Sequence, residues 1–182
     1  MKQVLFIQGA GAGTHDAWDD KLVDSLRREL GAGYDVRYPR MPNEADPSYA
    51  AWKVALAEEM AGLADGAIVV GHSIGATILV NALAESPPKR KLAGIFLIAA
   101  PFVGPGGWPS DDIRPVANLG ARLPPNTPVH LYHGSEDDTA PLAHVDLYAA
   151  AIPGAILHRL SGRDHQLNDD LREVAADIRA LR

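Results

Sequence analysis

Short apolar runs alternate with amphipathic stretches along this chain. Most of the apolar runs are rich in β-branched residues and continuously apolar, which is typical of strands covered on both faces. The predicted strands are Val4–Gln8, Tyr34–Tyr38, Ala67–Val70, Gly94–Ala99, Val129–Tyr132 and Ile156–Leu160. Strands that alternate with helices over short connections predict an α/β fold, a six-stranded and mostly parallel sheet with helices on both faces.

Apolar residues at helical spacing predict the helices between these strands. The stripes run over residues 18–30, 52–63, 142–152 and 167–181. We expect Trp18 to lie in the core, because it opens the first stripe. We expect the second helix to begin at Asp46-Pro47, since aspartate is a good cap and proline suits the first helical position.

The segment Pro101–Pro128 departs from this rhythm. It is rich in proline and glycine, and it has only a short possible helix around residues 111–123. We expect a loop after a strand end, where α/β proteins build their sites, and Trp108 is a candidate for contact with substrate. No repeat or shift in composition marks a second domain, so residues 1–182 are expected to form one domain.

Gly71-His72-Ser73-Ile74-Gly75 follows a predicted strand and precedes a helix-forming stretch, Ala76–Glu85. A Gly-x-Ser-x-Gly pattern at this junction is typical of a nucleophile elbow, a tight turn that exposes the serine Oγ. Glycine is expected at positions 71 and 75 because a side chain at either one would collide with the neighbouring strand or helix. The sequence therefore predicts Ser73 as a nucleophile.

A serine nucleophile needs a base, usually a histidine held by a carboxylate, and both are expected beyond later strand ends. His165 follows the last predicted strand and is the candidate base. The acid comes from the cluster after the fifth strand, with Asp137 favoured; its neighbours Glu136 and Asp138, and Asp111 and Asp112 in the proline-rich segment, remain open. His130 and His158 lie inside strands, and they and His72 and His144 are expected to be structural.

The chain resembles a small α/β-hydrolase over nearly its full length. The segment 71–75 resembles the elbow of that family, 133–141 its His-Gly-x-x-Asp-x-x-x-Pro segment, and 162–165 its Gly-x-x-His. The resemblance implies Ser73 as nucleophile, Asp137 as acid and His165 as base. The chain departs from the larger members in two ways: it is expected to start at what would be their third strand, which leaves six strands, and to have only the proline-rich loop in place of a helical cap domain.

The oxyanion hole needs two backbone N–H donors. Ile74, directly after the nucleophile, should supply one. By resemblance to the family's His-Gly-x loop, Ala10 supplies the other, with Gln8 in place of the usual histidine. The same glycine loop also allows a dinucleotide-binding interpretation, but Gly9-x-Gly11-x-Gly13 lacks the third glycine of that fingerprint and the acid expected after the second strand.

Composition narrows the possible partners. A net charge of −6, from 17 Lys+Arg against 23 Asp+Glu, argues against nucleic acid and anionic membranes. The absence of cysteine excludes disulfides and a thiolate nucleophile. No signal peptide or membrane span is predicted, so we expect a cytoplasmic protein.

The sequence therefore predicts a serine hydrolase of the carboxylesterase or thioesterase kind. It would act on a small-molecule acyl substrate through a Ser-His-Asp triad, with no cofactor and no metal. The alternatives are an acyltransferase and a catalytically silent binding domain with the same fold. The substrate and the oligomeric state are not predicted.

Overall fold

The computed structural model describes residues 1–181 of the chain. At its centre is a six-stranded sheet in the order β2-β1-β3-β4-β5-β6, and every neighbouring pair of strands is parallel. The strands are β1 (Lys2–Ile7), β2 (Tyr34–Arg37), β3 (Ala67–His72), β4 (Leu92–Ile98), β5 (Val129–Gly134) and β6 (Ile156–Leu160). All six predicted strands are present, and the predicted α/β fold is confirmed.

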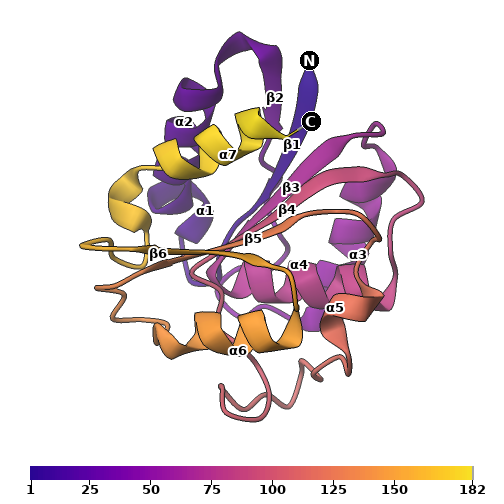
Figure 1. The fold of residues 1–182 in the computed structure, drawn as a ribbon, viewed down its shortest axis with the longest axis vertical. Helices are drawn as coiled ribbons and strands as arrows, with labels where there is room; N and C mark the ends of the chain where they lie inside the picture. The colour runs from indigo at the N-terminus through magenta and orange to yellow at the C-terminus, as the bar shows by residue number, and fades with distance from the viewer. Residues whose placement is uncertain (182) are drawn as a thin grey trace.

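Helices connect successive strands and cover both faces of the sheet (Figure 1). They are α1 (Thr14–Ala17), α2 (Asp19–Leu30), α3 (Tyr49–Ala61), α4 (Ser73–Glu85), α5 (Leu119–Arg122), α6 (Ala143–Ala151) and α7 (Arg172–Ala180), with 3-10 turns η1 (Gly31–Gly33) and η2 (Leu167–Asp169). Among residues 1–181, no helix is long and apolar enough to cross a membrane.

The two faces of the sheet carry separate apolar cores, because successive side chains of a strand point in opposite directions. In β1, Val4 and Phe6 pack with residues of α2 and α7, such as Leu22 and Ile178. Leu5 and Ile7 pack on the opposite face with residues of α3, α4 and α6. Burial on both faces explains why these strands are continuously apolar.

Several helix predictions need correction. The second helix begins at Tyr49 rather than at Asp46-Pro47, and Ser48 is its cap, with an Oγ that accepts the N–H of Ala51. The stripe at residues 167–181 is divided, because Leu167 lies in the 3-10 turn η2 and α7 begins only at Arg172.

The first stripe is also shorter than predicted. Trp18 precedes α2 and is 54% exposed, so it is a surface residue and not part of the core. Its ring lies under the Lys21 ammonium, which is 5.6 Å from the ring centroid. A Lys ammonium over the face of a Trp ring is attracted by the quadrupole of the ring, which is a cation–π interaction.

The proline-rich segment forms no cap domain. Between β4 and β5, α5 is the one helix in the described chain, and it covers four residues of the predicted 111–123 region. The carboxyl ends of β1 and β3 are adjacent, while β2 lies on the far side of β1. The order in which strands are added to the sheet therefore reverses between β1 and β3, and open α/β sheets place their sites at such a point.

Candidate active site

Ser73 lies at the sharp turn between β3 and α4. Its φ is +52°, a left-handed conformation that non-glycine residues rarely adopt. A Cβ on Gly75 would lie 1.9 Å from the carbonyl oxygen of Gln8, and one on Gly71 would lie 2.6 Å from the Cα of Ala76. Only glycine fits at both positions, so the predicted elbow geometry is present.

The structure brings the three predicted triad residues together. The Ser73 Oγ is 2.9 Å from the His165 Nε2, and the His165 Nδ1 is 2.8 Å from the Asp137 Oδ2. The Asp137 side chain is fully buried, and the His165 side chain is 13% exposed. Each residue follows a different strand, β3, β5 or β6, so the parallel sheet places all three at one edge.

Asp137 is held as a carboxylate from several sides. Its Oδ1 accepts the N–H groups of Thr139 and Ala140, and its Oδ2 faces the His133 Nε2 at 3.1 Å as well as His165. Burial alone would raise the pKa of this carboxyl, but these hydrogen bonds outweigh burial and hold the pKa below its usual range. Asp137 is therefore ionised at neutral pH and able to orient His165.

The other candidate acids lie elsewhere. Asp112 accepts the N–H of Tyr49 at the start of α3. Glu136 and Asp138 are exposed, and Asp138 contacts Thr139 rather than His165. Asp111 is exposed in the proline-rich segment.

The acid and base loops are joined through their backbones. Ser135 N–H donates to Leu160 O, and Glu136 N–H donates to Arg163 O. A Cβ on Gly134 would lie 2.1 Å from the Arg163 carbonyl oxygen, so glycine is required for this close approach. This contact gives a physical reason for the glycine of the His-Gly-x-x-Asp segment.

Of the two predicted oxyanion donors, Ile74 directly follows Ser73, and Ala10 follows Gly9, where an added Cβ would lie 3.1 Å from the Ser73 Cβ. The Ile74 N–H belongs to the first turn of α4, where N–H groups have no intrahelical acceptor. Within residues 1–181, the Ala10 N–H makes no hydrogen bond, whereas the N–H groups of Gly9 and Gly11 are both engaged. Ala10 and Ile74 therefore both retain an N–H that can donate to a substrate.

Glu44, which sequence analysis did not single out, binds the glycine loop. Its carboxylate accepts the N–H groups of Gly13 and His15, each at 3.0 Å, and the Gln8 side-chain amide at 2.5 Å. The backbone donors that a dinucleotide pyrophosphate would use are thus already occupied by an anion. This contact argues against the dinucleotide-binding interpretation of the loop.

A buried pair, Asp19 and His72, joins three parts of the site. Asp19 Oδ2 accepts the Gly9 N–H at 2.7 Å and contacts the His72 Nδ1 at 2.9 Å, and both side chains are at most 1% exposed. The His72 Nε2 lies 3.0 Å from the carbonyl oxygen of His165. Both partners of the His72 ring are acceptors, so both ring nitrogens must carry protons and His72 is an imidazolium.

The electrostatics of this pair agree with that assignment. Burial alone would lower the pKa of His72, but the carboxylate of Asp19 outweighs burial and raises it. Burial alone would raise the pKa of Asp19, and His72 outweighs it and lowers the pKa. Through its contacts with Asp19 and His165, His72 links the loop that carries His165 to the loop at Gly9.

Trp108 packs against His144, which lies within electrostatic reach of Asp137. Its ring packs edge-on against the His144 imidazole with 5.5 Å between centroids, and the indole is 37% exposed. It lines an open depression formed by residues of the proline-rich segment, between Val103 and Pro115. None of the residues that line this depression belongs to the triad.

Comparisons with known proteins identify the family and the fold of the chain. The sequence model of the Alpha/beta hydrolase family matches residues 4–179. The chain belongs to this family. No curated protein sequence matches the chain significantly.

Solved structures share this α/β-hydrolase fold at low sequence identity. The ydeN gene product from B. subtilis is 19% identical with a TM-score of 0.72, and the match covers 99% of this chain and 100% of that one. Est1E from Butyrivibrio proteoclasticus is 14% identical with a TM-score of 0.70, covering 98% and 86%. A thioesterase domain from the curacin biosynthetic pathway is 15% identical with a TM-score of 0.68, covering 97% and 92%.

Proposed function

We propose that this α/β-hydrolase is a serine hydrolase that cleaves a carboxylic ester, thioester or related acyl bond. The observation that carries the proposal is the continuous chain of contacts from Ser73 through His165 to Asp137, with distances of 2.9 and 2.8 Å. An esterase and a thioesterase domain among the structures of similar fold are consistent with it.

In the proposed reaction, the Ser73 Oγ attacks the acyl carbonyl carbon while its proton moves to the His165 Nε2. Asp137 fixes the tautomer that leaves this nitrogen free, because it accepts the proton on Nδ1. The Ala10 and Ile74 N–H groups stabilise the negative oxygen that forms. His165 then protonates the leaving alcohol or thiol, and water, activated in the same way, releases the carboxylic acid from Ser73.

The substrate class follows from the surroundings of the site. In the described chain, the segment that connects β4 to β5 supplies no helical cap over the site. We therefore propose that the site is open on that side. An open site suits small or exposed acyl groups, since it offers little apolar wall to a long chain. Trp108 packs on His144, on which the charge of Asp137 acts, so we propose that it borders the substrate as the sequence suggests.

Hydrolysis of p-nitrophenyl esters of increasing acyl length tests the proposal. We expect turnover of acetate and butyrate esters, with a loss of about 10⁴-fold or more in kcat for Ser73→Ala and for His165→Gln. Ser86→Ala is the matched control, because Ser86 is exposed at the other end of α4, and it should retain full activity. Equal rates for Ser73→Ala and wild type would refute the proposal.

An acyltransferase would share the acyl-enzyme and differ in the group that attacks it. Adding a series of small alcohols to the same assay distinguishes the two, because a transferase would form new ester faster than free acid. A folded wild type that hydrolyses none of the esters and reacts with no serine-directed reagent would instead favour a binding domain.

A further inference from the structure

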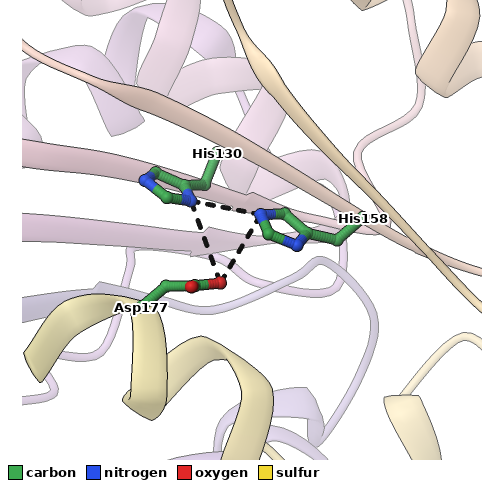
Figure 2. A group of neighbouring side chains, drawn as sticks. All are labelled: His130, His158 and Asp177. Atoms are coloured by element: carbon green, nitrogen blue, oxygen red, sulfur yellow. Dashed lines mark hydrogen bonds and ion pairs between the residues drawn. The ribbon is translucent and has the colours of Figure 1, made fainter. Parts of the chain in front are cut away.

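Two histidines and an aspartate meet on the sheet face that is covered by α2 and α7, away from the triad. His130 is the second residue of β5, His158 lies in the middle of β6, and Asp177 lies on α7 (Figure 2). In the sheet register His158 pairs with Tyr132, so it is diagonal to His130 on the same face. Ser73, Asp137 and His165 follow the carboxyl ends of the strands, whereas His130 is near the amino end of β5.

The three facing atoms have the spacing of a metal-ligand set. The His130 Nδ1 is 3.2 Å from the His158 Nε2, and these atoms are 3.9 and 3.5 Å from the Asp177 Oδ2. A triangle with these sides has its centre about 2.1 Å from every corner, and zinc–nitrogen and zinc–oxygen bonds are about 2.0–2.2 Å long. Within residues 1–181, this is the one group of at least three His, Cys, Asp or Glu side chains with such convergence.

The two imidazoles are of the ligand type that zinc and related ions prefer. Burial lowers the pKa of His130 and of His158, although the carboxylate of Asp177 opposes this effect. The His130 Nδ1 and the His158 Nε2 are hydrogen-bonded to each other at 3.2 Å, so one of them carries a proton that a bound ion would displace to another ring nitrogen or to solvent. A neutral imidazole is a common ligand of zinc and related ions.

Neighbouring aromatic residues orient this group. Tyr132 donates its hydroxyl proton to Asp177 Oδ2 at 2.6 Å, which fixes the carboxylate as second-sphere partners of metal ligands commonly do. Phe96 stacks on the His130 ring at 4.6 Å, and Tyr132 stacks on the His158 ring at 4.3 Å. The side chains of His158 and Asp177 are 23% and 32% exposed, so an ion and a water ligand have access from solvent.

We propose that His130, His158 and Asp177 bind one divalent transition-metal ion of the zinc type. The ion would join the edge strand β6 and the helix α7 to β5. A rotation of the imidazole rings about their side-chain bonds would break the hydrogen bond between them and turn both nitrogens toward the ion. Because none of the three ligands belongs to the triad and none lies in a loop at the carboxyl end of a strand, we assign the ion a structural role, and the proposal does not depend on the hydrolase activity.

Titration of the untagged, metal-free protein with ZnCl2 tests the proposal. We expect one equivalent to bind the wild type and to raise its Tm. His158→Gln and Asp177→Asn should each raise the Kd at least about tenfold. His15→Gln is the matched control, since His15 also lies beside a carboxylate, 2.8 Å from Asp16, but outside this group. It should bind zinc as the wild type does.

Co²⁺ provides a second measurement that needs no variant. Visible absorption bands of a tetrahedral or five-coordinate Co²⁺ site should appear on the wild type and be displaced by one equivalent of Zn²⁺. The absence of stoichiometric zinc binding to the wild type would overturn the proposal. Equal affinity in the wild type and a folded His158→Gln would also overturn it.

Discussion

Replacing Asp19 tests whether a single buried pair positions both the oxyanion loop and the base. Asp19→Asn keeps the shape of the side chain and removes its charge, whereas Asp19→Ala removes both. Asp24→Asn is the control, because Asp24 lies on the same helix and makes only an exposed contact with Arg27. An exposed ion pair contributes about 0–1 kcal/mol, so this control should be close to neutral.

The expected loss follows from the contacts of Asp19. Its Oδ2 accepts two hydrogen bonds, from the Gly9 N–H at 2.7 Å and the His72 Nδ1 at 2.9 Å. Bonds to a charged group contribute about 1 kcal/mol more than neutral ones, so Asp19→Asn should lower the free energy of unfolding by about 2–3 kcal/mol. Asp19→Ala leaves the buried imidazolium of His72 without its partner and should cost about 3–5 kcal/mol.

The pH dependence of this loss has a definite shape. The lowered pKa of Asp19 contributes stability above about pH 4, and this contribution disappears as the pH falls through the folded-state pKa. The raised pKa of His72 contributes stability that is complete below about pH 6.5 and is lost at higher pH. The difference between wild type and Asp19→Asn should therefore be largest between about pH 4 and 6.5.

Urea denaturation at several pH values measures these differences, and p-nitrophenyl acetate hydrolysis reports the effect on the site. We expect kcat to fall with KM little changed in Asp19→Asn, because the pair positions reacting groups and does not contact substrate. Asp19→Asn with the stability and kcat of Asp24→Asn would refute this account of the pair. A ¹⁵N NMR measurement at pH 6 that finds only one proton on the His72 ring would also refute this account.

Three further outcomes are expected. Gly75→Ala should leave little folded protein, since its Cβ would lie 1.9 Å from the Gln8 carbonyl oxygen, whereas Gly33→Ala, with open space around it, should change stability by less than about 0.5 kcal/mol in the same melts. Glu44→Ala should speed amide exchange at Gly13 and His15 and lower kcat about tenfold or more, and exposed Glu58→Ala should do neither. Asp137→Asn should destabilise the protein at pH 7. The difference in the free energy of unfolding should shrink below about pH 4, because the lowered pKa of Asp137 contributes stability only above that range. A constant difference down to pH 2 would contradict this assignment.

The sheet and the elbow could be predicted because each depends on local sequence. Continuous apolar runs determined the strands, and the order of Ser73, Asp137 and His165 after three strands followed from the family's motifs. The structure brings those three residues within hydrogen-bond distance. Which of the three neighbouring acids Glu136, Asp137 and Asp138 faces His165 depends on the path of one loop, and the sequence pattern could favour Asp137 only by resemblance.

Contacts between segments that are distant in the sequence could not be predicted from such local patterns. Asp19 occurs beside Asp20 at the start of an amphipathic helix, and nothing in the sequence distinguishes the buried carboxylate from its partly exposed neighbour. Trp18 fitted the apolar stripe, but the turn between α1 and α2 places it in solvent. The meeting of His130, His158 and Asp177 requires both the register of β5 with β6 and the rotation of α7, neither of which is a property of one segment.

The most direct test of the central proposal is the intact mass of the protein after incubation with a fluorophosphonate. An activated serine displaces fluoride and retains the phosphonyl group as a stable adduct. We predict one adduct on the wild type, none on Ser73→Ala, and one on Ser86→Ala. A folded wild type without an adduct, or an adduct that persists on Ser73→Ala, would contradict the assignment of Ser73 as the nucleophile.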